Sequence, residues 1–288
     1  MHAMKVELLN VFTHEGAGGN PCPIVCDADG LSDADMQSVA RDHGHESGFV
    51  LPSKREAFDY RFRYWVPNHE MEMCGHATVG ALWLLANEGR LESAQVRIDT
   101  LSGAVFGFVE TVADGGPSVE ITQPAGAVRD LGDDAKAAVL EVLGIGPSDL
   151  LDVPVQNAVT SRVKTLIPIR DVERLDRLQP DFSRIERLCT QIGSTGLYPF
   201  APHASNDRTF DARQFPRSSG YPEDAATGIA ATALSFGLLR NGLVERSPKL
   251  IRVMQGRAMG HLSEIRVRIG FAGDKAIGCT VGGAVSPA

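Results

Sequence analysis

Hydrophobic positions along the chain follow two spacings, which together predict an α+β protein. Segments with alternating apolar residues, or with aromatic and β-branched residues, predict strands. These segments are 5–13, 24–28, 48–53, 57–67, a meander of 95–110 and 118–124 with turns at 102–103 and 115–116, and strand-rich regions around 159–169 and 196–202. Apolar residues at helical spacing predict helices at 32–44, about 77–88, 134–144, 171–181 and 182–193. Because strands and helices do not alternate regularly, a doubly wound parallel sheet is not expected.

Two local patterns give sharper expectations. In SDADMQSVARDHG, Ser32 has the side chain of an N-cap and Gly44 is expected to stop the helix. Near the end of the chain, the segments 250–260 and 263–273 are expected to pair as a hairpin.

Internal sequence similarity relates the two halves of the chain. A shift of 153 positions places CGHATVGALWLLANEG, which starts at Cys74, on TGIAATALSFGLLRNG, which starts at Thr227. The matched pairs include Gly75 with Gly228, Ala77 with Ala230, Leu85 with Leu238, Gly89 with Gly242 and, upstream, Phe62 with Phe215. Shared apolar helix patterns could produce such a match by chance, but we favour a duplication.

The duplication predicts two pseudo-symmetric lobes, residues 1–120 and 121–288. Each is expected to be a curved mixed sheet or barrel wrapped around one central apolar helix, and the last strand could return to the first lobe. The helix N-termini at Gly75-His76 and Gly228-Ile229 offer free N–H groups that attract an anion. A small-molecule site between the lobes is therefore expected.

Composition and charge exclude several classes of function. The chain has 28 basic and 36 acidic residues and no cluster of basic residues, which argues against binding to the phosphate backbone of nucleic acid. No apolar run approaches the roughly 20 residues of a membrane-spanning helix, and we expect no secretory signal. Five cysteines without a CxxC pair predict free thiols in a reducing cytoplasm.

The segment HEMEMCGH raises the alternative of a metal site. Its possible ligands are His69, Glu70, Glu72, Cys74 and His76. The segment lacks the HExxH spacing, however, and no second Cys or His cluster accompanies it. We therefore interpret the two glutamates as a solvated edge, and we expect neither a metal nor a cofactor.

Cys74 and His76 are the reactive side chains at the start of the first apolar helix. A helix N-terminus lowers the pKa of a thiol, so Cys74 could be a nucleophile or base, although free cysteines are usually small buried residues. His76 could be an acid, a base or an anchor for an anion, and a structural role is about equally reasonable.

Three other residues have both a structural and a functional interpretation. Glu46 enters an apolar strand, where a carboxylate is costly unless it is paired or functional, but an exposed turn residue is the simpler interpretation. Asp224 in GYPEDAATG is a candidate N-cap of the second helix and a candidate site residue. Asn20 lies in GGNP, a turn that only weakly resembles an anion-binding loop.

Six motifs in chain order resemble the PhzF-like phenazine-biosynthesis isomerases of the diaminopimelate epimerase superfamily. They are VFTHEGAGGNPCPIV, HESGFV, EMCGHAT, ITQPA, GYPEDAATG and MQGRAMGHLSEIRV. Each is weak alone, but six in this order over nearly the whole chain are specific.

The resemblance implies a diaminopimelate epimerase-like fold, a homodimer, and catalysis without cofactor or metal. Such enzymes move a proton between carbons of a small unsaturated amino or carboxylic acid in specialised-metabolite biosynthesis. By position, the catalytic residues are Glu46, His76 and Asp224. The implied substrate-binding residues are Gly75, Gly228, Ile229, Thr227, Asn20 and Cys74.

The chain departs from the family pattern at two positions. Ile229 stands where the family usually has serine, and His261 replaces an arginine in the last motif. Both changes put the identity of the substrate in doubt.

Two rival interpretations stay open. Proline racemases and hydroxyproline dehydratases of the same superfamily also begin their first helix with MCGH. Thr227 occupies the position of a racemase's second cysteine, so two-thiol racemisation is not expected. A trans-3-hydroxyproline dehydratase with Cys74 as base remains, as does a non-catalytic small-molecule binding protein.

Overall fold

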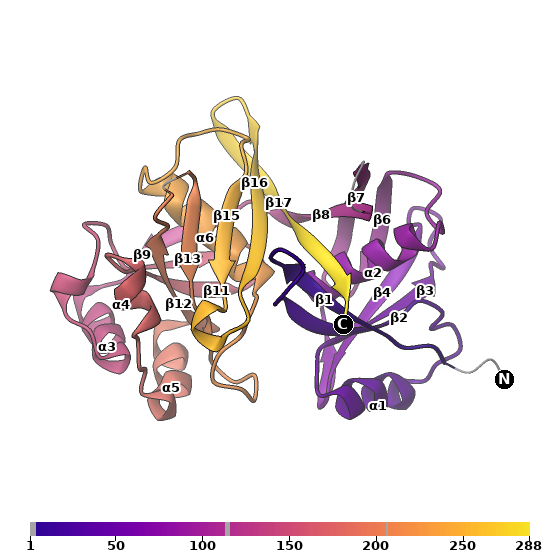
Figure 1. The fold of residues 1–288 in the computed structure, drawn as a ribbon, viewed down its shortest axis with the longest axis horizontal. Helices are drawn as coiled ribbons and strands as arrows, with labels where there is room; N and C mark the ends of the chain where they lie inside the picture. The colour runs from indigo at the N-terminus through magenta and orange to yellow at the C-terminus, as the bar shows by residue number, and fades with distance from the viewer. Residues whose placement is uncertain (1–3, 113–115, 206) are drawn as a thin grey trace. The chain divides into compact units, whose positions relative to one another are not determined.

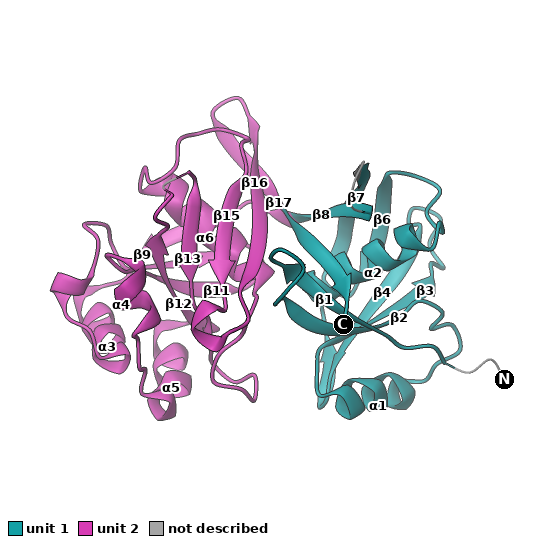
Figure 2. Ribbon diagram, in the orientation of Figure 1, with its two compact units in different colours: residues 1–122, 281–288 teal, residues 123–280 magenta. Residues whose placement is uncertain are grey.

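The chain divides into two units in the computed structural model, which describes residues 4–112, 116–205 and 207–288. Unit 1 comprises Met1–Thr122 with Val281–Ala288, and unit 2 comprises Gln123–Thr280 (Figure 2). The chain leaves unit 1 within strand β8 (Gly116–Pro124) and returns to it within β17 (Lys275–Pro287). Among the described residues, no helix has both the length and the apolar character needed to span a bilayer.

Unit 1 is a barrel of mixed strands that curve around one helix (Figure 1). Its other strands are β1 (Glu7–Thr13), β2 (Asn20–Val25), β3 (Ser47–Pro52), β4 (Tyr60–Val66), β5 (His69–Met71), β6 (Gln95–Thr100) and β7 (Gly103–Val112). Its helices are α1 (Asp33–His43) and α2 (Gly75–Asn87). The strands neighbour one another in the order β1, β2, β3, β4, β6 and β7. The first pair is antiparallel, and the direction then alternates between parallel and antiparallel along this order. β8 pairs with β7, and β17 pairs with both β8 and β1, which closes the ring.

The central helix α2 explains why the strands close around it. The helix is apolar on every side, and all its residues from Gly75 to Leu85 are buried. A helix of this kind is stable only inside a core, and α2 contacts β1, β2, β3 and β7. Small residues permit the close packing: a Cβ at Gly48 in β3 would lie 3.2 Å from the Cβ of Ala77.

The predicted ends of α1 are confirmed. Ser32 and Asp35 form a capping box, in which each side chain accepts a hydrogen bond from the other residue's backbone N–H. Gly44 follows the helix with a φ of 70°, in the left-handed region that glycine tolerates.

Unit 2 repeats the same plan. Its other strands are β9 (Ala127–Asp130), β10 (Gln156–Val159), β11 (Val163–Pro168), β12 (Gly196–Pro202), β13 (Thr209–Ala212), β14 (Phe215–Pro216), β15 (Ile251–Gln255) and β16 (Ser263–Ala272). Its helices are α3 (Asp133–Leu143), α4 (Val172–Asp176), α5 (Phe182–Ile192) and α6 (Gly228–Arg240), with short 3-10 turns η1 (Pro147–Asp149) and η2 (Arg257–Met259). From β10 through β11, β12, β13 and β15 to β16, the pairing alternates between antiparallel and parallel in the same order as from β1 to β7.

The central helices confirm the predicted pseudo-symmetry. Each has 13 residues, and Gly228 lies at the position that the shifted sequence assigns to Gly75. Their N-caps, Cys74 and Thr227, are both extended and neither side chain caps its helix. Helix α6 contacts β9, β10, β11 and β16, as the core helix of its own unit.

Some predicted boundaries change. Helix α2 begins two residues earlier than expected, at Gly75. The predicted helix over 171–181 is too long, since α4 ends at Asp176. Pro180 disfavours helical geometry in the residue before it, which opposes continuation of the helix. The expected hairpin near the end is confirmed as β15 and β16. The second turn of the meander, predicted at 115–116, falls partly outside the described residues.

Gly282→Ala tests the closure of the unit 1 barrel by β17. The new Cβ would lie 2.1 Å from the backbone oxygen of Val119 in β8, which cannot move as a side-chain end can. Overpacking of this kind should lower the free energy of unfolding by about 1–3 kcal/mol. Chemical denaturation measures the change.

The matched control for this prediction is Gly270→Ala in β16. Its added Cβ would come no closer than 3.7 Å to a neighbour, which is ordinary contact. Equal stability of the two variants would contradict the assigned packing of β17.

Candidate active site

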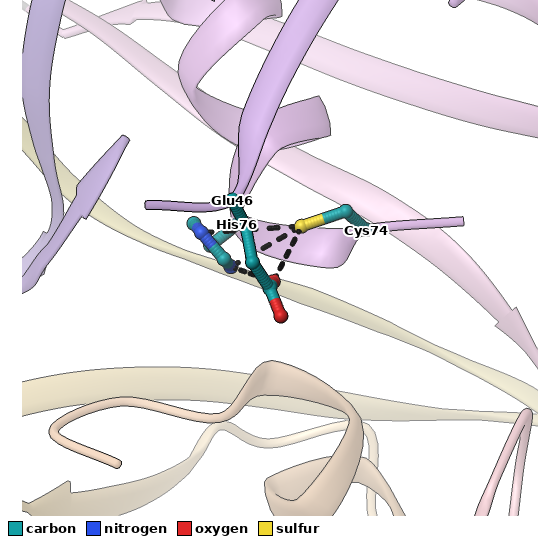
Figure 3. Close-up of side chains that lie close together, drawn as sticks. All are labelled: Glu46, Cys74 and His76. Carbon is teal, nitrogen blue, oxygen red and sulfur yellow. Dashed lines mark hydrogen bonds and ion pairs between the residues drawn. The ribbon is translucent and has the colours of Figure 1, made fainter. Parts of the chain in front are cut away.

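Three chemically active side chains meet at the N-terminal end of α2 (Figure 3). The Cys74 thiol lies 3.1 Å from Glu46 Oε2 and 3.4 Å from His76 Nδ1. His76 Nδ1 lies 3.6 Å from the same Glu46 oxygen. We refer to Glu46, Cys74 and His76 as the trio.

Glu46 is placed by the chain that leads into β3. It follows the glycine stop of α1 and immediately precedes the buried residue Ser47. The thiol of Cys22, in β2, donates a hydrogen bond to the backbone oxygen of Glu46 at 3.2 Å. The Ser47 hydroxyl donates to the backbone oxygen of His45 and fixes the same turn. The simpler interpretation of Glu46, an exposed turn residue, is therefore wrong.

Cys74 and His76 are placed by the first turn of α2. The Thr78 hydroxyl donates to the backbone oxygen of Cys74 at 2.7 Å and shares a second hydrogen bond with the hydroxyl of buried Tyr64. Because no side chain caps α2, the helix leaves its first N–H groups to other partners. The Cys74 side chain points to Glu46 instead of capping the helix.

The trio contains a neutral thiol. Burial, followed by the charge of Glu46, raises the pKa of Cys74 well above its usual value. The N–H of Ala77 favours the thiolate, but its effect is smaller. The expectation that the helix N-terminus lowers the pKa of Cys74 is therefore wrong. In this state the thiol donates a hydrogen bond to the Glu46 carboxylate.

The carboxylate is the accessible group of the trio. The Glu46 side chain is 26% exposed, against 9% for His76. Gly75 lies between the other two members and is buried, yet a Cβ added there would meet no atom within 4 Å outside its chain neighbours and the backbone of its own helix. The space directly beside Gly75 is therefore open to at least a methyl-sized group.

Unit 2 has its own polar cluster before α6. The Thr227 hydroxyl donates to Asp224 Oδ2 at 2.5 Å. Gln255 donates from Nε2 to the backbone oxygen of Asp224 at 2.7 Å, and its Oε1 accepts from the hydroxyl of buried Tyr198 at 2.9 Å. The N-cap of α6 is Thr227, so the prediction of Asp224 as N-cap is wrong. Sequence reasoning missed Tyr198 and Gln255, although Gln255 belongs to the last matching motif.

The other predicted binding residues occupy defined positions within their units. Gly228 is buried at the start of α6, and Ile229 follows it, half-buried. Asn20 begins β2, the strand whose Cys22 thiol holds the backbone of Glu46. His261, the second departure from the family motifs, is exposed.

The residues considered for zinc in the sequence do not form one cluster. Glu70 is partly buried, and both its oxygens accept from Arg63, at 2.6 and 2.8 Å, so it is not a freely solvated edge residue. Glu72 is exposed. Within residues 4–112, 116–205 and 207–288, the group that could hold a cation is the trio, whose ligand atoms lie within 4.8 Å of one another.

Comparison with known sequences identifies the family. The phenazine biosynthesis-like protein family, PhzC-PhzF, matches residues 9–285. The uncharacterized isomerase YddE of Escherichia coli O157:H7 is 33% identical over 288 residues, which cover 98% of this chain and 96% of that protein. A trans-2,3-dihydro-3-hydroxyanthranilate isomerase of Pseudomonas fluorescens is 27% identical over an alignment that covers 89% of this chain and 87% of that protein. The chain belongs to the PhzC-PhzF family, and it is an enzyme of the isomerase class.

Solved structures share the fold. A Bacillus anthracis phenazine biosynthesis protein of the PhzF family matches with a TM-score of 0.89 at 24% identity, over 100% of this chain and 97% of that chain. A hydroxyproline epimerase from Agrobacterium vitis matches with a TM-score of 0.62 at 14% identity, over 99% and 90% of the two chains. The predicted epimerase-like fold is confirmed.

The raised pKa of Cys74 predicts slow alkylation. A thiol reacts as the thiolate, so iodoacetamide should modify Cys74 slowly at pH 7 and faster as pH rises. Glu46→Gln removes a charge that raises the pKa and should therefore speed modification at a given pH. Peptide mass spectrometry separates Cys74 from the other four cysteines.

Cys279 is the control for this measurement. Burial alone raises its pKa to about 12, so Glu46→Gln should leave its rate unchanged. Rapid alkylation of Cys74 at pH 7 in the unmodified protein would contradict the neutral thiol.

Proposed function

We propose that this protein is a cofactor-independent isomerase that moves a proton and a double bond in a small unsaturated amino or carboxylic acid. Glu46 is the proposed proton shuttle. The observation that carries this proposal is the position of its carboxylate, which is partly exposed and lies 3.6 Å from His76 at an uncapped helix N-terminus. The name of the Pseudomonas fluorescens relative supports the substrate class.

In the proposed reaction, the Glu46 carboxylate takes a proton from one carbon of the substrate. The electron pair of the broken C–H bond enters the adjacent unsaturated system, and the double bond moves along the carbon skeleton. Glu46 then returns the proton to a second carbon, so no oxidant or reductant is needed. General acid–base transfer by a positioned side chain of this kind typically contributes 10²–10⁴-fold.

The surrounding groups would stabilise the charge that develops. We propose that His76 and the N–H groups at the start of α2 bind the anionic intermediate, which the uncapped helix N-terminus supports. Cys74, as a neutral donor, would hold the Glu46 carboxylate in one orientation. For Asp224 and Thr227 we propose the substrate-holding roles that the family resemblance implies, supported by the hydrogen bond that joins their side chains before α6.

The alternative, a dehydratase with Cys74 as base, has weaker support. It needs a thiolate, which burial and the Glu46 charge both disfavour. Homodimer assembly, a cytoplasmic location and a role in specialised metabolism stay predictions from the sequence.

Glu46→Gln separates the two mechanisms. The amide keeps the shape of the side chain but cannot accept the proton, so turnover should fall about a hundredfold or more while substrate binding persists. Cys74→Ala should keep much more activity, because it removes only an orienting hydrogen bond. The assay follows isomerisation of trans-2,3-dihydro-3-hydroxyanthranilate and of unsaturated cyclic amino acids by liquid chromatography and mass spectrometry.

The reverse pattern would overturn the assignment. If Cys74→Ala is inactive while Glu46→Gln turns over normally, Cys74 is the base and the dehydratase mechanism replaces the shuttle. Absence of turnover and of binding across the substrate panel would favour a different substrate class.

Ile229 predicts the polarity of the substrate near α6. Isoleucine offers no hydrogen bond where the family usually has serine, so a polar substrate group facing it would lose a partner, at about 1–3 kcal/mol. The unmodified enzyme should therefore turn over the hydroxyanthranilate more slowly than an alkyl-bearing unsaturated cyclic amino acid.

Ile229→Ser is the matched variant for this prediction. It should raise kcat/KM for the hydroxyanthranilate by roughly tenfold, since each 1.4 kcal/mol corresponds to one factor of ten. A preference of the unmodified enzyme for the hydroxyanthranilate would show that other residues supply the donor.

A further inference from the structure

We propose that the trio is a reversible binding site for Zn²⁺, and that its occupancy inhibits the isomerase. The inhibition rests on the proposed role of Glu46. The binding does not, because it follows from the ligand types and distances alone.

The ligand atoms already have the spacing of a zinc site. In tetrahedral coordination, Zn–S is about 2.3 Å and Zn–N or Zn–O about 2.0–2.1 Å, which places neighbouring ligand atoms about 3.3–3.6 Å apart. In the trio the separations are 3.1 Å for sulfur and oxygen, 3.4 Å for sulfur and nitrogen, and 3.6 Å for nitrogen and oxygen. Shifts of a few tenths of an ångström would therefore suffice to bring all three onto one ion.

The charges of the trio also match a divalent cation. A thiolate, a carboxylate and a neutral imidazole together carry two negative charges, so a bound Zn²⁺ gives a neutral assembly. Without a cation, a thiolate at Cys74 would be buried beside the Glu46 charge. Zn²⁺ removes this conflict by displacing the thiol proton, which passes to solvent.

The donor set selects the kind of metal. Thiolate and imidazole suit Zn²⁺, whereas Mg²⁺ and Ca²⁺ prefer oxygen ligands. Of the residues that the structure describes, three side chains converge on the point, so a fourth coordination position would be left for water or another ligand. The partly exposed Glu46 provides an approach from solvent. A three-ligand site with an open position differs from the closed, four-ligand sites that have structural roles.

Inhibition follows from which atoms the ion would occupy. Zn²⁺ would bind the Glu46 oxygen that lies nearest to both Cys74 and His76. A metal-bound carboxylate is a poor proton acceptor, and the imidazole would no longer be available to an anionic intermediate. Removal of the ion by a chelator should restore activity.

The direct test measures binding without an activity assay. After dialysis against a chelator, the protein is titrated with Zn²⁺ in competition with a chromogenic chelator. We expect one tightly bound equivalent, no competition by Mg²⁺, and at least a tenfold loss of affinity in each of Cys74→Ser and His76→Gln. Co²⁺ should give a thiolate charge-transfer absorption band that Cys74→Ser abolishes.

A matched control comes from another histidine–carboxylate pair. His203 Nδ1 lies 2.6 Å from the buried Asp211 in unit 2, but Arg257 already pairs with the same carboxylate. His203→Gln should therefore leave the tight equivalent unchanged. Absence of a tight equivalent, or equal affinity in the unmodified protein and Cys74→Ser, overturns the site. A Co²⁺ complex of the unmodified protein without the thiolate band overturns it even if a variant fails to fold.

The activity arm separates this inference from the proposed function. Zn²⁺ at one equivalent should abolish turnover, and chelation should restore it. Bound Zn²⁺ with full turnover would show that the inhibitory role is wrong. If Glu46→Gln remains active, Glu46 is not the proton shuttle. The measured zinc binding would still stand, because it does not depend on that role.

Discussion

Burial of an apolar helix inside a ring of strands is the constraint on which the rest of unit 1 depends. Helix α2 has no polar face, so it must be covered on all sides. The strands that cover it bring Glu46, at the entrance to β3, against Cys74 and His76 at the helix start. The glycine at position 48 permits this approach, because a larger side chain would meet both Ile24 and Ala77. The site is thus a consequence of how the core closes.

The neutral state of the Cys74 thiol follows from the same burial. Two neighbouring anions in a low-dielectric site are costly, and the molecule resolves this by keeping the Cys74 thiol neutral. The thiol can then donate to Glu46, which leaves the carboxylate oriented and accessible. Replacement of the thiol proton by a divalent cation would instead stabilise the Cys74 thiolate beside Glu46. The two proposed roles of the trio, proton transfer and zinc binding, would therefore compete for the same side chains.

The two units have the same strand plan but different side chains at the start of their central helices. Their central helices begin with Gly75 and Gly228 after uncapped, extended residues. Unit 1 has the thiol of Cys74 at this point, whereas unit 2 has Thr227, whose hydroxyl is engaged by Asp224. This difference between the two helix starts fits the single proton shuttle that we propose better than a symmetric pair of thiols.

The sequence by itself determined the elements that depend on local patterns. The two apolar helices, the cap and stop of α1 and the β15–β16 hairpin follow from periodicity and end residues. The match at a shift of 153 positions indicated two similar lobes, and the motif order indicated the family. It did not determine what Glu46 touches or whether Cys74 is ionised, since these depend on strands far apart in the chain. A helix N-terminus alone favours a thiolate, but burial and a carboxylate brought in from position 46 oppose it more strongly. Only the tertiary structure could decide between these effects, because the decisive charge and the solvent exclusion come from outside the local segment.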